Sequence, residues 1–345
     1  ERMMLNAGPA VVRCLVQPCV QPSPQLARLT VTPQMRKESI PGSQRDDWAR
    51  PCLLDPEFLQ QRTLSYDLAM HDLVSAAEAI LGPDLGNLHR APILPPQQTP
   101  PALRRGQVQA RMGSPVTKAE RKDARNHAVR FERTQEWRNF LEIYQRFVAE
   151  WVVPNVGNVP LLYQRKPILR VVLPGSVPPT QFHCDADYFH DSNEINFWLP
   201  LTRTWGGNTL WSESEPGVGD YAPFECVPGE VVRFYGNRAR HYTLENDTDG
   251  TRVSIDFRVV PHHLFQPPTQ LASTLSRHAL DPGTSKRGYY ALAHPADQGL
   301  PAAELYALRR SWREQQHDGG DSDSAQGSDE DSEITDASAS AVVGR

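Results

Sequence analysis

The feature that most constrains the fold is a series of short segments in which apolar and polar residues alternate. A period of two places successive side chains on opposite faces of a β-strand. Gly, Pro and Asn-Asp turns separate the segments, so that each is predicted to be one strand. They are Pro167–Pro174, Glu194–Leu201, Asn208–Ser214, Gly229–Gly236 and Thr251–Val260. Short antiparallel strands at this density predict a barrel or sandwich.

The flanking regions carry helical or irregular patterns. Leu53–Gly82 is predicted to be a helix with Asp55 as its N-cap, and Ala91–Gly106 is a Pro-rich linker. Val116–Val152 has a helical pattern whose second half faces a core, with Pro154 as its end. We therefore predict a Pro-rich irregular or disordered leader (1–52), a helix with a linker (53–115), a helix with the β core (116–262), a C-terminal helical extension (263–316) and an acidic disordered tail (317–345).

Charge and cysteine usage narrow the classes of protein. The formal net charge is −5, but eight acidic residues and one arginine from Asp318 onward contribute −7, so the remainder is about +2. No strong attraction to nucleic acid or membrane follows, and no apolar run is long enough to span a bilayer. Five cysteines without a CxxC pair favour a reduced intracellular protein, most simply cytoplasmic. A basic stretch between Leu5 and Lys37 leaves organellar targeting as the alternative.

A metal site is predicted where "QFHCDADYFHDSNEINFWLPL" enters a strand. His183 and Asp185 are two residues apart, so in a strand both side chains would lie on one face and reach one ion. The third ligand has to come from elsewhere, and His241, which follows the strand at Gly229–Gly236, is the best candidate. Two imidazoles and one carboxylate leave three coordination positions open, as Fe(II) requires for dioxygen chemistry.

A binding site for a dicarboxylate is predicted downstream of His241. Arg252 and Ser254 share a strand face, and a buried guanidinium beside a hydroxyl suits a bidentate contact with a carboxylate. A dicarboxylate held there could chelate iron with its other end.

The whole pattern, His-x-Asp, 55 residues, His, ten residues, Arg-x-Ser, resembles the Fe(II)/2-oxoglutarate-dependent dioxygenases. "FWLPLT" with "GGNTLWSES", and "PGEVVRFYGNRARHYTLEN", are similar to the phytanoyl-CoA-dioxygenase-like branch, and the run as a whole to the StrG-like proteins of streptomycin biosynthesis. The resemblance implies a mainly β, double-stranded β-helix (jelly-roll) core with flanking helices. It also implies His183, Asp185 and His241 as catalytic iron ligands, and Arg252 and Ser254 as the residues that bind 2-oxoglutarate. O2 would be the second co-substrate, and ascorbate is a candidate reductant.

The resemblance further implies the reaction. Related halogenases have Gly or Ala where this chain has Asp185, so hydroxylation is expected, with succinate and CO2 as co-products. The expected substrate is a small polar or carbohydrate-like metabolite, with neither nucleic acid nor membrane as a partner, and the oligomeric state is open. Candidate residues of the substrate pocket are Arg170, Gln181, Asp187, His190, Asn196 and Arg258.

Two other functions compete with this interpretation. Arg252 and Arg258 have an Arg-x5-Arg spacing that also occurs in AlkB-like nucleic-acid demethylases. Against it, the segment after His183 differs from that family and no nucleotide-recognition lid is evident. The second alternative is a jelly-roll protein that binds a ligand without catalysis.

Overall fold

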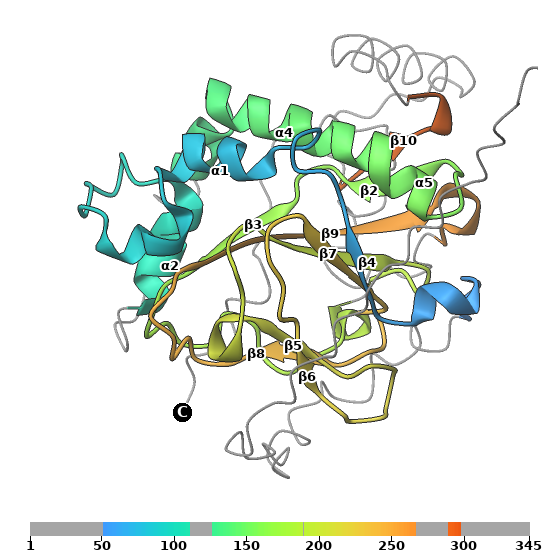
Figure 1. Ribbon diagram of the computed structural model, residues 1–345. Coiled ribbons are helices and arrows are strands. Elements are labelled where there is room, and N and C mark those ends of the chain that lie inside the picture. Colours follow the sequence, from blue (N-terminus) through green and yellow to red (C-terminus); the bar gives the residue numbers. More distant parts are fainter. Residues whose placement is uncertain (1–50, 111–125, 189, 267–288, 298–345) are drawn as a thin grey trace, which may run out of the picture. The chain divides into compact units, whose positions relative to one another are not determined.

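The computed structural model describes residues 51–110, 126–188, 190–266 and 289–297 (Figure 1). The chain divides into two units, Glu1–Ser39 and Ile40–Arg345, and all described residues lie in the second. The α-helices are α1 (Leu73–Leu81), α2 (Pro101–Ala110), α4 (Gln135–Phe147) and α5 (Val153–Asn155). The strands are β1 (Arg62–Ser65), β2 (Leu161–Gln164), β3 (Ile168–Val172), β4 (Ile195–Pro200), β5 (Leu210–Ser212), β6 (Ala222–Pro223), β7 (Glu230–Phe234), β8 (His241–Thr243), β9 (Arg252–Pro261) and β10 (Tyr290–Ala293).

The strands form two antiparallel sheets. The larger has the order β1-β7-β4-β9-β2-β10, with β3 also paired to β9, and the smaller has the order β6-β5-β8. The ten-residue β9 is the central strand, since it pairs with β4 along one edge and with β2 and β3 along the other. The prediction of a mainly β, jelly-roll core is confirmed, and all five segments with alternating residues contain a strand.

Helices cover the outer face of the large sheet, with α4 lying across it in Figure 1. The Thr134 hydroxyl accepts from the Trp137 amide and caps α4 at its N-terminus. Its buried side chains recur at helical spacing, and the Tyr144 and Phe257 rings meet edge-on at 5.1 Å. This packing buries one face of β9 beneath the helices. Its opposite face points into the space between the two sheets.

Alternation along β4 separates the two faces of the sheet. Ile195, Phe197 and Leu199 join the core beneath the helices, whereas Trp198 packs between the two sheets. There it meets the Phe224 ring at 5.7 Å. Residues in phase with Trp198 therefore face the space between the sheets, where the predicted metal ligands lie.

Two of the helix boundaries predicted from sequence are wrong. Leu53–Gly82 is not one helix: Asp55 caps a short 3-10 helix at Pro56–Leu59, β1 follows, and α1 begins only after Asp72. The backbone of β1 instead pairs with β7, because a tertiary partner outweighs a weak helical pattern. The helix predicted for Val116–Val152 breaks at residues 132–134, and its part before residue 126 lies outside the described residues.

The linker and the extension also differ from expectation. The helix α2 occupies the end of the Pro-rich linker, and β10 forms in the extension that was predicted to be helical. The helix in the α4 region continues through a π-helical turn, so that Pro154 lies inside α5 rather than ending it. Residues 1–50 of the predicted leader and the whole predicted tail fall outside the described ranges. Within those ranges, no helix is both long and apolar enough to cross a bilayer.

Candidate metal centre

The two candidate histidine ligands lie directly opposite each other. His183 and His241 form an antiparallel bridge, with N–O distances of 3.2 and 2.8 Å, which brings their ring centroids to 4.4 Å. The spacing of His183 and Asp185 predicted that both lie on one strand. Asp185 instead begins a 3-10 helix at Asp185–Tyr188. Its amide donates to the Gly236 carbonyl at 2.9 Å, which ties the start of this helix to the segment after β7.

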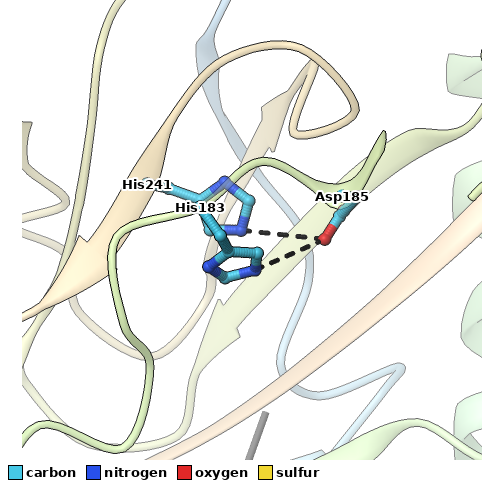
Figure 2. A group of neighbouring side chains, drawn as sticks. All are labelled: His183, Asp185 and His241. Atoms are coloured by element: carbon cyan, nitrogen blue, oxygen red, sulfur yellow. Dashed lines mark ion pairs between the residues drawn. The ribbon is translucent and has the colours of Figure 1, made fainter. Parts of the chain in front are cut away.

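Three potential ligand atoms converge (Figure 2). The Asp185 Oδ1 lies 3.7 Å from His183 Nε2 and 3.8 Å from His241 Nε2. Each ring's Nδ1 lies within hydrogen-bond distance of the carbonyl two residues earlier, Gln181 at 2.7 Å and Ala239 at 3.0 Å. Since a carbonyl can only accept, each Nδ1 carries a proton, and Nε2 is the ring nitrogen left to bind a metal. The donors are therefore two imidazole nitrogens and one carboxylate oxygen.

For Asp185 and His241, the electrostatics favour the protonation states that bind metal. Burial alone would raise the pKa of Asp185, but the Arg258 guanidinium holds it well below its usual range. Burial, followed by the proximity of His183, lowers the pKa of His241 to about 3. Near neutral pH, Asp185 is therefore anionic and His241 neutral, as ligation requires.

The pair predicted to bind a dicarboxylate is buried on the interior face of β9. Arg252 is 1% exposed and Ser254 is fully buried. The guanidinium donates from Nη1 to the Asn208 carbonyl at 3.2 Å. Among the described residues, Arg252 Nε and Ser254 Oγ have no hydrogen-bond partner. Burial, followed by repulsion from Arg170, lowers the pKa of Arg252 to about 9. Arg252 Nε and Ser254 Oγ are thus two buried groups that could donate hydrogen bonds to a bound acceptor.

Two residues predicted to line the substrate pocket contact the candidate ligand Asp185. Arg258 makes a bidentate contact with Asp185, 2.9 Å from Nη2 to Oδ1 and 2.9 Å from Nε to Oδ2. Asn196 Nδ2 donates to Asp185 Oδ2 at 2.6 Å. They pair across β4 and β9, so both donors approach the carboxylate from the same level of the sheet.

The structure places three other candidate pocket residues as follows. Arg170 pairs with Asp256, 2.6 Å from Nε to Oδ2, on the same sheet face as Ser254. The Gln181 side chain is exposed, and the contact of this residue with the candidate site is made by its backbone carbonyl, which lies near His183 Nδ1. Asp187 accepts from the Cys184 amide at 3.0 Å and so closes its own turn. Their substrate contacts remain predictions.

His190 belongs to a polar cluster that the sequence did not identify. Its Nδ1 lies 2.8 Å from Oε2 of the fully buried Glu194, whose Oε1 accepts from the Tyr290 hydroxyl. Arg258 adjoins this cluster, with Nε 3.7 Å from Glu194 Oε2 and Nη1 3.4 Å from the Tyr289 hydroxyl. Glu194 lies two residues before Asn196 and therefore on the same face of the predicted strand, which could have identified it as a neighbour of the site. Nothing in the sequence pattern identifies Tyr289 and Tyr290.

Comparison with known proteins gives one close sequence match. No protein-family model matches the chain. The streptomycin biosynthesis protein StrG of Streptomyces griseus is 43% identical over 125 residues, 36% of this chain and 58% of StrG. The predicted similarity to StrG-like proteins is thus confirmed, over less than two thirds of StrG.

Solved structures resemble the chain more distantly. The apo non-heme monooxygenase ThoJ is 14% identical, covers 75% of this chain and 96% of its own, and has a TM-score of 0.35. CytC3 with Fe(II) and alpha-ketoglutarate is 13% identical, covers 70% and 94%, and has a TM-score of 0.33. Similarity at these TM-scores is too weak to define the function of this chain.

Proposed function

We propose that the chain is an Fe(II)- and 2-oxoglutarate-dependent dioxygenase that hydroxylates a small polar or carbohydrate-like metabolite. The observation that carries the proposal is the convergence of two Nε2 atoms and one carboxylate oxygen from His183, His241 and Asp185. This donor set suits Fe(II) and leaves coordination positions for a co-substrate and O2.

The partnerless atoms of β9 support 2-oxoglutarate as the co-substrate. Arg252 Nε and Ser254 Oγ are buried donors that lack an acceptor among the described residues. A buried guanidinium with no carboxylate partner is costly, and a bound carboxylate would relieve that cost. Arg252 and Ser254 would hold the distal carboxylate, while His183, Asp185 and His241 would hold the metal.

The chain's contribution to the reaction is to bind and orient. When bound, Fe(II) and 2-oxoglutarate supply oxidative decarboxylation by O2, which yields succinate and CO2 and hydroxylates a C–H bond. The Nδ1 contacts of His183 and His241 with backbone carbonyls would orient both rings so that each Nε2 faces the metal. Asp185 adds the single negative charge of the ligand set.

Two observations support a small polar substrate. The side chains with some exposure around the ligands are polar, with 22% for His190, 12% for Arg258 and 11% for His183. StrG is a streptomycin biosynthesis protein, which favours a small molecule over a macromolecule. The body of the chain is near neutral, which argues against a nucleic-acid demethylase.

Succinate release tests this proposal. Purified protein with Fe(II), 2-oxoglutarate, ascorbate and O2 would be screened against polyols, amino sugars and cyclitols, beside Asp185→Ala as the matched inactive variant. A hydroxyl-bearing compound should accelerate succinate formation in wild type only. Equal succinate formation by wild type and Asp185→Ala in every reaction would contradict the proposed activity.

A further inference from the structure

Asp185 is the candidate ligand whose side chain the local backbone constrains least. The two histidines are fixed by their mutual bridge and by Nδ1 contacts to carbonyls, but Asp185 starts a single-turn 3-10 helix. Its carboxylate could rotate about its own bond to the chain. Its orientation must therefore come from the groups that contact it.

Those groups fix both carboxylate oxygens. Arg258 spans Oδ1 and Oδ2 of Asp185, each at 2.9 Å, and Asn196 donates to Oδ2 at 2.6 Å. Among the described residues, Oδ2 thus accepts two hydrogen bonds, whereas Oδ1 accepts one and is the oxygen that lies 3.7 and 3.8 Å from the two Nε2 atoms. An ionised carboxylate oxygen has two lone pairs, so Oδ1 keeps one for a metal.

The number of oxygens that Asp185 offers decides how many positions stay open. A carboxylate can bind a metal through one oxygen or through both. Two oxygens from Asp185 would occupy a position that a chelating co-substrate and O2 both need. We propose that Arg258, with Asn196, is the positioning residue that keeps Asp185 a one-oxygen ligand. This inference rests on the proposed iron site and extends it to residues that do not touch the metal.

Arg258 is itself held in place by the polar cluster. Its Nη1 lies 3.4 Å from the Tyr289 hydroxyl, which in turn donates to Gln164 Oε1 at 3.0 Å. Its Nε also lies 3.7 Å from Glu194, so one guanidinium bridges two buried carboxylates. Tyr289 immediately precedes β10. The segment that follows β9 in the chain thereby contributes to the orientation of a candidate metal ligand.

For the orientation of Asp185, the two parallel N–H donors of the Arg258 guanidinium matter more than its positive charge. An arginine can donate to both oxygens of a carboxylate at once, whereas a lysine ammonium is a point charge that cannot reproduce the planar pair. Arg258→Lys therefore retains the charge and loses the orientation. Arg233→Lys is the matched control: Arg233 is buried in the same sheet but donates to the Glu57 carbonyl and stacks on Phe58.

The test measures metal binding directly, without turnover. Wild type, Arg258→Lys, Asn196→Ala and Arg233→Lys would be titrated anaerobically with Fe(II) against a competing chelator, and with Co(II) while its d–d absorption is recorded. We expect Arg258→Lys to lose roughly 10- to 100-fold in Fe(II) affinity, the usual effect of removing a group that orients a ligand. Its Co(II) spectrum should change as well, because a second carboxylate oxygen alters the coordination.

The control and the second variant make the outcome decisive. Arg233→Lys should bind both metals as wild type does, even where it unfolds more easily. Asn196→Ala keeps Arg258 and should shift the Co(II) spectrum in the same direction, so that a poorly folded Arg258→Lys leaves a working test. Wild-type affinity and spectrum in both Arg258→Lys and Asn196→Ala would overturn the positioning role. Absence of metal binding in wild type would overturn the iron site as well, and the two failures are therefore distinguishable.

Discussion

Replacing Arg252 by methionine should stabilise the ligand-free protein and weaken its binding of 2-oxoglutarate. Arg252 is 1% exposed, makes one hydrogen bond in the described structure, and has a pKa of about 9 against about 12.5 for a guanidinium in water. Each tenfold loss of proton affinity corresponds to about 1.4 kcal/mol, so burial together with repulsion from Arg170 disfavours the charged form by up to about 5 kcal/mol. Methionine has a similar length and no charge.

The two effects have opposite signs and separate assays. Replacement of a poorly compensated buried charge by an apolar side chain stabilises proteins by about 1–4 kcal/mol at most. Thermal unfolding of the metal-free Arg252→Met variant should therefore show a higher Tm, by about 2–4 °C per kcal/mol. Loss of a buried charge partner costs about 2–5 kcal/mol of binding, so the 2-oxoglutarate Kd should rise by about 30-fold or more, with Fe(II) affinity unchanged.

Either of two results would refute this reasoning. A metal-free Arg252→Met variant that unfolds more easily than wild type would mean that the guanidinium is already satisfied without a ligand. Wild-type 2-oxoglutarate affinity in the variant would mean that the carboxylate binds elsewhere.

Three further predictions follow from single contacts. Ser254→Ala should leave the ligand-free stability unchanged, because the hydroxyl has no partner among the described residues, and should weaken 2-oxoglutarate binding by about two- to tenfold in calorimetry. Gly236→Ala should weaken Fe(II) binding in a chelator competition, since its Cβ would lie 2.7 Å from the Asn196 side-chain amide and displace it from the metal ligand that it contacts. Tyr290→Phe should lower the free energy of unfolding by about 1–3 kcal/mol in urea, because it removes a donor from the fully buried Glu194.

Each of these predictions has a contradicting result. Gly86→Ala is the control for the glycine variant, since its Cβ would meet nothing closer than 3.8 Å, and equal Fe(II) affinity in both would refute the steric argument. A Ser254→Ala variant with unchanged 2-oxoglutarate affinity would remove the hydroxyl from the proposed site. A Tyr290→Phe variant as stable as wild type would show that Glu194 does not need that donor.

Sequence periodicity predicted the β core because its strands are buried on a regular face. The five segments with alternating residues each contain a strand, and β9 has the face that Arg252 and Ser254 were predicted to share. The strands β1 and β10 were missed because they lie in segments whose pattern was interpreted as helical, and their partners lie far away in sequence. Pairing between distant segments is a property of the folded chain rather than of a local window.

The candidate site was predictable to the same extent. Residue type and spacing predicted His183, Asp185 and His241 as ligands, and the structure brings these candidates together, although by a bridge and a helical turn rather than along one strand. Asn196 was predicted to lie near the pocket from its strand phase, and Arg258 was a pocket candidate singled out by its spacing from Arg252. That they hold the Asp185 carboxylate depends on where the loop before β4 crosses the sheet, which no local pattern specifies.

The most direct test of the central claim is an anaerobic titration of the metal-free protein with Fe(II) and then 2-oxoglutarate. The measured quantity is the weak visible charge-transfer band of the chelate. The account predicts the band in wild type, its absence in Asp185→Ala, and a higher 2-oxoglutarate requirement in Arg252→Ala. Wild-type protein that binds neither Fe(II) nor 2-oxoglutarate would contradict the account and would leave the β core as a candidate binding module.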